Sequence, residues 1–540
     1  MTNMPFPSRE VSDFDELLLL DGLLGRVWRP WIVKALTILL AAVFIVNVSP
    51  YWIPQRDSAL YMTLARSLAR GEGFQEGPGV PHTLVYPGFP LILAGVMKLF
   101  GERMFFMNLC VTLMGMGCIA LTYLVMKPWL EKRVAMLVAF LTGSTHTLLN
   151  YSGVLITDVP HLFFTLLSLW LIQLTWFAGS ARRRLLAGLC AGVSVMAAAM
   201  IRPNGLFILV PLALAMVIFP RRVALKTWEK LVVLGVWLAA VGIPLLCWVL
   251  FIGNVDAEIR KTYLQASILS SGFAPFVGNM LRQLADFPEE LAKTLGRNTA
   301  LPPGNLLILA FFLVGLVRMI RFGAWHVSAY AVVGTAFATI DIQRRYLLAI
   351  LPLTVACSLI GAAWMALALF RASFVPRKRR KLIPWALLGL IIFMPLANVL
   401  PVAKLTWEKH RRPFYQKHGE GNWSDHMVLA EWMRESTPEH SVFWARDSYV
   451  LAYFSDRTVR GPATPWEGES EHYWRRDVGL QNHLAHWKPD YIVVDTDRRV
   501  REIIENRLIA RRRLKAQPVE IEGVYQLRVY KVLEPPVARK

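Results

Sequence analysis

The first apolar run of the chain and the polar segment that follows it read WIVKALTILLAAVFIVNVSPYWIPQRDSALY, residues 31–61. The run from 31 to 49 is long enough to cross a hydrocarbon core of about 30 Å. Asp57 follows a few residues after it, so its carboxylate is expected at the rim of a membrane. A second acid, Asp158, also follows an apolar run, in Ile156-Thr157-Asp158-Val159-Pro160. Acids that recur at one membrane face indicate a reaction centre supplied from the lipid.

The composition divides the chain into two parts. Of the 540 residues, 55% are hydrophobic, and the mean hydropathy of +0.41 is high for a water-soluble globular protein. Apolar runs recur up to about residue 402, and the remainder is charged and contains turn residues but no spanning run. We therefore predict a polytopic all-α membrane domain at 1–402 and a C-terminal soluble α/β domain at 403–540.

Hydropathy predicts about eleven transmembrane helices in the first part. Their approximate bounds are 31–49, 104–126, 134–150, 160–178, 185–201, 205–220, 231–252, 304–320, 326–342, 346–369 and 383–402. Segment 84–100 is also apolar, but it is short and interrupted by Pro87 and Pro90. We predict that it is a helix lying on the membrane surface, because counting it as a span would reverse every later loop.

Basic residues predict the orientation. Alternate loops carry clusters such as Arg182-Arg183-Arg184 and Arg377-Lys378-Arg379-Arg380-Lys381. Lys and Arg near span ends are retained in the cytoplasm, so the N-terminus is predicted inside and the C-terminal domain outside. The same bias explains the net charge of +21, and it argues against nucleic acid as a partner. The five cysteines all fall in apolar runs and are interpreted as packing residues.

The extramembrane segments carry recognisable patterns. Residues 58–70 form an expected amphipathic helix with Leu60, Leu64 and Leu68 on one face. In the C-terminal part we expect a small α/β layer. Its predicted elements are a helix at 425–435, a strand at 441–445, a helix at 448–454, a loop around 461–470, a strand at 491–495, a basic helix at 498–513 and a strand at 524–532.

Asp57 and Asp158 are the candidate catalytic residues. Each adjoins the hydrocarbon region, where an ionised group is costly without a partner. The alternative is that each caps a helix, since an acid before a helix is a common N-cap and Pro160 favours a first helical turn.

Four arginines on the predicted outer face are candidates for binding a phosphate, because guanidinium groups bind phosphate in a bidentate manner. The alternative is that they reach lipid headgroups. Three tyrosines within or beside the same motifs are assigned to a substrate cavity. The arginines are Arg56, Arg202, Arg344 and Arg345, and the tyrosines are Tyr61, Tyr86 and Tyr346.

Taken in order, these segments resemble the GT-C glycosyltransferases, and within them the protein-mannosyltransferase and lipid A aminoarabinose-transferase group. The resemblance covers nearly the whole membrane part. After the first acid it consists of Leu68-Ala69-Arg70-Gly71-Glu72-Gly73-Phe74, Tyr86-Pro87-Gly88-Phe89-Pro90, Thr157-Asp158-Val159-Pro160, Ile201-Arg202-Pro203 and Arg345-Tyr346-Leu347-Leu348-Ala349-Ile350-Leu351-Pro352.

The resemblance implies an inverting glycosyltransferase with a polyprenyl-phosphate sugar as donor. The acceptor would be a hydroxyl of a lipid, protein or glycan at the extracytoplasmic face, and the sugar a hexose or pentose. Asp57 would be the base that deprotonates the acceptor, and Asp158 would shape the cavity or hold a partner. The implied location is a bacterial inner membrane, in contact with membrane lipids.

The sequence departs from this group in two ways that affect the expected metal and substrate. Many relatives have two acids close together near the first position, whereas Ser58 follows Asp57 here. This weakens any assignment of a metal, so no cofactor is assigned and a divalent metal stays open. The aminoarabinose transferases have a lysine where this chain has Tyr86, which argues against that substrate.

Two other functions remain as alternatives. One is a polytopic lipid or glycan transporter or flippase without transferase chemistry. Transporters usually show internal repeats or helices broken at mid-membrane, whereas here the acids lie at span ends. The other is a non-catalytic protein of the same fold that only binds lipid or glycan.

Overall fold

The structure is a computed structural model of the 540-residue chain. It describes residues 21–22, 30–77, 80–177, 180–208, 226–254, 273–295, 302–321, 323–338, 344–371, 398–399, 423–446, 448–461, 477–494 and 501–536. The predicted spans at 205–220 and 383–402 lie largely outside these residues.

The chain divides into two compact units, which are described separately. The first contains residues 1–49, 108–247 and 274–408, and the second contains 50–107, 248–273 and 409–540. The second unit thus joins the first long loop to the C-terminal segment. The domain boundary at 402/403 is close to one of these divisions, but it remains a prediction.

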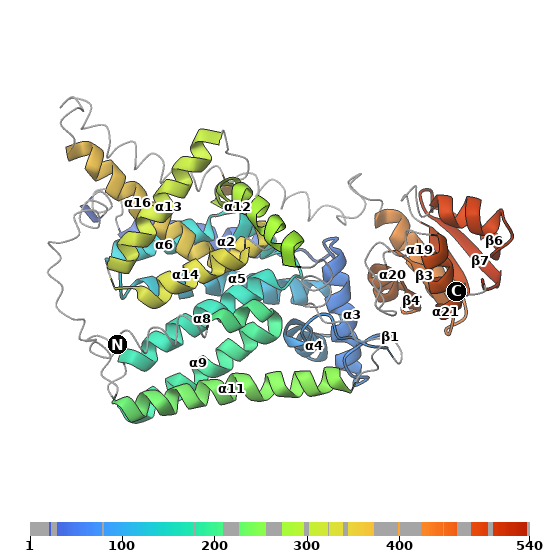
Figure 1. Cartoon of the computed structure of the whole chain (residues 1–540), viewed down its shortest axis with the longest axis horizontal. Helices are drawn as coiled ribbons and strands as arrows, with labels where there is room; N and C mark the ends of the chain where they lie inside the picture. The colour runs from blue at the N-terminus through green and yellow to red at the C-terminus, as the bar shows by residue number, and fades with distance from the viewer. Residues whose placement is uncertain are drawn as a thin grey trace. The chain divides into compact units, whose positions relative to one another are not determined.

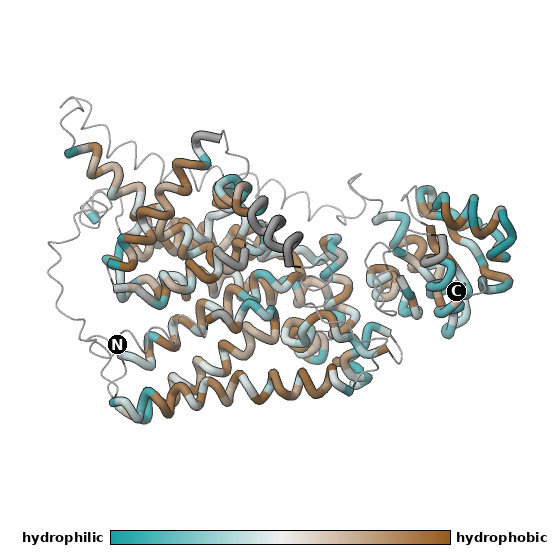
Figure 2. The backbone as a smooth tube through the Cα atoms, viewed as in Figure 1, coloured by the Kyte–Doolittle hydropathy of each residue, from teal (hydrophilic) through white to brown (hydrophobic). Residues whose placement is uncertain are grey.

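The first unit is helical. Its helices are α2 (Pro30–Val46), most of α5 (Met104–Met126), α6 (Lys132–Gly143), α7 (His146–Tyr151), α8 (Asp158–Phe177), α9 (Ala181–Ile201), η2 (Pro203–Ile208), most of α11 (Thr227–Gly253), α12 (Phe273–Leu295), α13 (Pro302–Arg321), α14 (Trp325–Ala338), α15 (Arg344–Leu347), η4 (Leu348–Ile350) and α16 (Leu351–Arg371). Among the described residues, six helices are long and apolar enough to cross a membrane. The tube of α11 has the colour of hydrophobic residues along most of its length (Figure 2).

Close helix packing in this unit depends on glycine. A Cβ atom added to Gly315 in α13 would overlap the backbone of Cys357 in α16, and one added to Gly361 would overlap the backbone of Phe311. Small residues allow two helix backbones to approach closely, as in many membrane helix pairs. The two glycines therefore explain why α13 and α16 pack so extensively.

The predicted span at 134–150 is wrong as one continuous helix. It ends as α6 at Gly143 and restarts as α7 at His146. The Thr145 side chain accepts a hydrogen bond from the Leu148 backbone N–H, and the Ser144 hydroxyl donates to the Leu141 carbonyl. Side chains of this kind compete for the backbone groups that would continue a helix. The count of eleven spans is accordingly not confirmed.

The first part of the second unit is the long loop after α2. It contains α3 (Arg56–Arg70), the hairpin of β1 (Gln75–Gly77) and β2 (Val80–Pro81), and α4 (Gly88–Phe100). Helix α3 ends at Arg70, and Gly71 caps it with a φ of 79° in the left-handed region. Helix α4 has 13 residues, about 20 Å of length, which is too short to cross the hydrocarbon core. The interpretation of segment 84–100 as a short helix and not a span agrees with this length.

The C-terminal part of the second unit is a five-stranded sheet with the order β4-β3-β5-β7-β6. The central strand β5 pairs in parallel with β3 and antiparallel with β7. The strands are β3 (Val442–Ala445), β4 (Thr458–Arg460), β5 (Tyr491–Val494), β6 (Lys515–Val519) and β7 (Arg528–Glu534), and the helices are α19 (Trp423–Ser436), α20 (Ser448–Ser455), α21 (Asp477–Trp487) and the π-helix η7 (Ile503–Ile509) (Figure 1).

Both faces of this sheet are buried, because successive side chains of a strand point to opposite faces. Phe443 of β3 and Val493 of β5 pack in one apolar cluster with α19 and α20. Trp444 and Ile492 pack in the other, with α21 and η7. The predicted α19, β3, α20 and β5 match the structure closely, whereas β4, α21 and β6 were not predicted.

Candidate functional site

The first unit places Asp158 against Arg202. Helix α8 begins at Asp158, and α9 ends at Ile201 with Arg202 in extended conformation before Pro203. A residue before proline is disfavoured in the helical region, so the chain turns at Arg202. Its Nη2 lies 2.9 Å from Asp158 Oδ2, and its Nε donates to Thr157 Oγ1 at 2.7 Å.

This ion pair is largely removed from solvent. The Asp158 side chain is 0% exposed and that of Arg202 is 16% exposed. A carboxylate in such an environment needs a charged partner, and Arg202 is that partner. The geometry therefore favours a role for Asp158 in holding Arg202, and not a role as the base that accepts a proton.

A second arginine, Arg345, lies near Arg202, and both contact the ring of Tyr346. The guanidinium carbon of Arg202 lies 5.1 Å from the centre of the Tyr346 ring. That of Arg345 also lies 5.1 Å from it, and Arg345 Nη2 donates to the Tyr346 hydroxyl at 3.2 Å. These distances are within the range of cation–π contacts. Four of the predicted residues, Asp158, Arg202, Arg345 and Tyr346, therefore meet in this unit, whereas the Arg344 side chain lies outside the described part.

The second unit holds Asp57 in the first turn of α3. The residue in the N-cap position is Gln55, and its side chain makes no cap hydrogen bond. Asp57 is therefore not the N-cap residue. The Ser58 hydroxyl donates to the Gln55 carbonyl at 2.6 Å and accepts from Trp52 Nε1 at 2.8 Å. Asp57 lies within this turn, between Gln55 and Ser58, and is half-buried. The Arg56 side chain lies outside the described part.

Three residues that were not predicted form a hydrogen-bonded chain in the same unit. The Val85 N–H donates to His82 Nε2 at 3.1 Å, so His82 Nδ1 carries the proton and donates to Glu76 Oε2 at 2.8 Å. Glu76 also accepts a hydrogen bond from the Tyr449 hydroxyl. Burial, then Glu76, and then the charge of Asp57 raise the pKa of Tyr449 well above its ordinary value. The Tyr449 hydroxyl therefore stays protonated and acts as a donor.

The two remaining tyrosines of the prediction also lie in this unit. Tyr61 is buried, with its ring 5.3 Å from that of Phe89. Tyr86 is half-buried, with its ring 5.5 Å from that of Trp248, and burial raises the pKa of its hydroxyl. Tyr61 occupies a packing position, and its assignment to a substrate cavity stays a prediction, as does that of Tyr86.

The described residues were also compared with the requirements of a metal-binding site. Within them, no three His, Cys, Asp or Glu side chains lie close enough together to hold an ion. Glu76 and His82 are residue types that bind metals and lie close together, but both ring nitrogens of His82 already make hydrogen bonds.

Comparison with solved structures identifies the class of fold. ArnT from Cupriavidus metallidurans in the apo state matches with a TM-score of 0.53 and 14% identity, over 93% of this chain and 97% of that one. The oligosaccharyltransferase of Archaeoglobus fulgidus in the apo form matches with a TM-score of 0.54 and 14% identity, over 87% of this chain and 70% of that one. This chain is an integral membrane protein with the fold of the GT-C glycosyltransferases.

A family model narrows this class for part of the chain. Residues 81–248 match the family described as dolichyl-phosphate-mannose-protein mannosyltransferase. Comparison with curated protein sequences finds no match. The resemblance to GT-C glycosyltransferases that the sequence motifs indicate is thus confirmed.

Proposed function

We propose that this protein transfers a sugar from a polyprenyl-phosphate-linked donor to an acceptor hydroxyl at the extracytoplasmic face of a membrane. The observation that carries the proposal is the pair of guanidinium groups, Arg202 and Arg345, at the ring of Tyr346. The fold and the family match support it. Dolichyl phosphate, which appears in the description of that family, is itself a polyprenyl phosphate.

In the proposed reaction the acceptor oxygen attacks the anomeric carbon of the sugar. The bond from that carbon to the phosphate oxygen breaks, and polyprenyl phosphate leaves with the electron pair. The hydroxyl proton passes to the Asp57 carboxylate, and the anomeric configuration inverts. Arg202 and Arg345 stabilise the leaving phosphate, because preformed cations are most effective where negative charge develops. Asp158 acts by holding Arg202 in place.

Arg56 and Arg344 keep their predicted role in binding the phosphate, and Tyr346 its role in the substrate cavity. The acceptor is a lipid, protein or glycan hydroxyl, and the sugar is a hexose or pentose. The proposed location is a bacterial inner membrane.

The function is tested by incubating the purified protein with labelled polyprenyl-phosphate sugars and a membrane extract. We expect label in a covalent product, together with release of polyprenyl phosphate. The same protein in sealed liposomes tests the transporter alternative. Movement of labelled donor between leaflets, without any covalent product, would establish a flippase and reject the transferase.

Replacement of Arg345 by alanine is expected to raise the KM for the donor by about ten- to a hundredfold. A hydrogen bond to a charged group contributes about 1.5–3 kcal/mol, and the KM for the acceptor should change much less. Steady-state kinetics with each substrate varied separately provides the measurement. Arg182→Ala, which changes an exposed arginine of α9, is the matched control. An unchanged donor KM in folded Arg345→Ala protein would remove Arg345 from the phosphate site.

The proposed orientation predicts which positions an impermeant thiol reagent reaches in sealed cells. In a cysteine-free background, needed because Cys190 and Cys247 are exposed, Tyr525→Cys should be labelled from outside. Tyr525 is 86% exposed. Arg182→Cys should be labelled only after the cells are opened. The reverse pattern would place Asp57 on the cytoplasmic side and contradict an extracytoplasmic reaction.

A further inference from the structure

Helix α20, which packs on the C-terminal sheet, also packs against α3, the helix that carries Asp57. Both helices belong to the second unit. The Trp52 ring lies 5.1 Å from that of Phe454 and 5.6 Å from that of Trp423. Because Trp52 Nε1 also donates to Ser58, this aromatic contact extends to the first turn of α3, next to Asp57.

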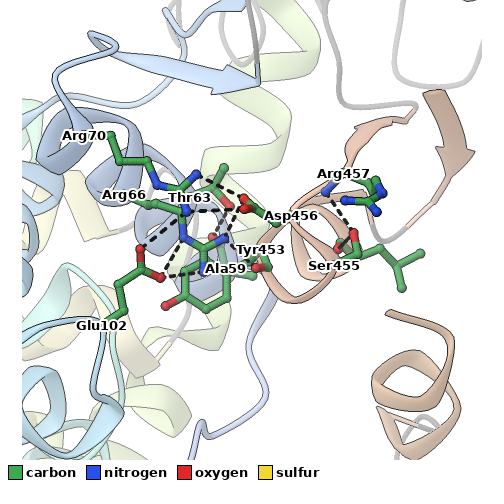
Figure 3. Close-up of polar contacts among 10 residues, drawn as sticks. Ala59, Thr63, Arg66, Arg70, Glu102, Tyr453, Ser455, Asp456 and Arg457 are labelled. Atoms are coloured by element: carbon green, nitrogen blue, oxygen red, sulfur yellow. Dashed lines mark hydrogen bonds and ion pairs between the residues drawn. The ribbon is translucent and has the colours of Figure 1, made fainter. Parts of the chain in front are cut away.

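Arg66 connects the middle of α3 to the end of α20 (Figure 3). Its Nη1 donates to the Tyr453 carbonyl at 2.6 Å, and its guanidinium carbon lies 3.9 Å from the centre of the Tyr453 ring. Its Nη2 lies 2.7 Å from Glu102, and the side chain is only 14% exposed. The last carbonyls of a helix lack partners within it, and a cation there is favourable. Arg66 supplies both the donor and the charge.

Near the other end of α20, Tyr449 connects it to the β1–β2 hairpin through a buried carboxylate. The Glu76 side chain is 3% exposed and that of His82 is 2% exposed. Glu76 takes one hydrogen bond from His82, within its own loop, and one from Tyr449, in the C-terminal part. A buried carboxylate that loses a donor is strongly destabilised. The Tyr449 contact is therefore a point at which the two parts of this unit depend on each other.

A third connection is weak by comparison. Arg70 Nη1 lies 3.2 Å from Asp456 Oδ1, but the two side chains are 44% and 52% exposed. Exposed ion pairs contribute little because water and salt screen them. Buried contacts, not the exposed pair, should therefore determine how firmly α20 holds the loop.

We propose that α20 is a positioning element for the reaction, with Tyr449 as its principal positioning residue. Its contacts with Glu76 and α3 keep the first turn of α3, and so Asp57, in the geometry needed for proton transfer. The C-terminal domain thereby acts on turnover and not on binding of the donor. This inference rests on the proposed function, because it takes Asp57 as the base.

The test uses the full-length protein with Tyr449→Phe, which removes one hydroxyl and keeps the ring. We expect kcat to fall by about ten- to a hundredfold, the range produced by a displacement of about 1 Å at a reacting group. The KM for the donor should stay within about twofold. Amide hydrogen exchange of residues 56–60 should become faster, which is a readout independent of activity.

Two controls match this substitution. Tyr525→Phe makes the same chemical change at an exposed residue of the same domain and should leave kcat and exchange unchanged. Asp456→Asn removes the exposed ion pair with Arg70 and a longer contact of 3.5 Å with Arg66 Nη1. It keeps a residue type that tolerates the left-handed φ of 55° at this position. It too should change kcat by less than about twofold. A loss with Asp456→Asn as large as that with Tyr449→Phe would overturn the assignment to the buried contact.

A second variant keeps the proposal testable if Tyr449→Phe does not fold. Glu76→Gln retains the size of the side chain but presents an amide N–H₂ to one of its two donors, so it should lower kcat in the same way. If both single variants fold, their effects should not add in the double variant, because both changes break one network. Additive losses would show that Tyr449 and Glu76 act separately and would reject the inference.

The outcome for Asp57 separates this inference from the proposed function. If Asp57→Asn abolishes turnover while Tyr449→Phe keeps both normal kcat and normal exchange, only the positioning role fails. If Asp57→Asn turns over normally, the proposed base fails, and faster exchange in Tyr449→Phe would then support only a structural contact.

Discussion

Asp57→Asn is expected to lower turnover by about 10²–10⁴-fold, the usual contribution of general acid–base catalysis. Asparagine has nearly the same size as aspartate but cannot accept the acceptor's proton at neutral pH. Asp57 lies in the first turn of α3 and is not the N-cap residue, so a structural role would include a favourable interaction with the helix dipole. Loss of a charge there changes stability by about 0.3–1 kcal/mol. Turnover assays at saturating donor, with thermal melting in detergent, provide the measurement.

Two further variants control this result. Asp57→Glu keeps the carboxylate but moves it by one methylene, so it should retain more activity than Asp57→Asn. Asp158→Asn should act mainly through Arg202 and raise the donor KM. Near-normal turnover of Asp57→Asn would reduce Asp57 to a residue that stabilises the helix and leave the base unassigned.

Arg202→Ala is expected to lower the free energy of unfolding by about 3–5 kcal/mol, the range found when one partner of a buried ion pair is removed. The reason is the fully buried Asp158 side chain, which would lose its cation. The substitution also removes the hydrogen bond to Thr157 and the contact with Tyr346. The melting temperature in detergent should fall clearly, and the donor KM should rise.

The double variant Arg202→Ala/Asp158→Asn separates stability from function. It removes the orphaned charge, so much of the lost stability should return, since replacing both partners of a buried pair is far less damaging than removing one. The donor KM should stay high because the cation is still missing. A wild-type melting temperature for Arg202→Ala alone would show that the ion pair is not essential to the fold.

Much of the fold could be predicted because membrane helices leave a strong signal in the sequence. The predicted span at 104–126 coincides with α5, and that at 160–178 differs from α8 by two residues at its start. One error occurred where side chains compete with the backbone. Ser144 and Thr145 break the span predicted at 134–150, and hydropathy is insensitive to such hydrogen bonds.

The candidate site could be predicted only in part. Each chosen residue stands in a local motif, such as Asp158 before Val159-Pro160 or Arg345 before Tyr346, and four of them do meet in the first unit. Glu76, His82 and Tyr449 were missed because the contact is not local. The only local signal was an acid and a histidine on either side of a short hairpin, and its partner Tyr449 lies in the C-terminal part.

The sequence by itself determined the membrane class, the approximate bounds of helices such as α5 and α8, and the resemblance to GT-C glycosyltransferases. These properties follow from composition, periodicity and short motifs, which act over a few turns of helix. Only the tertiary structure decided that Asp158 is paired with Arg202 and that Arg66 binds Tyr453, 387 residues away in the sequence. The physical reason is that a buried charge needs a partner in space, and which residue supplies it depends on how the chain packs.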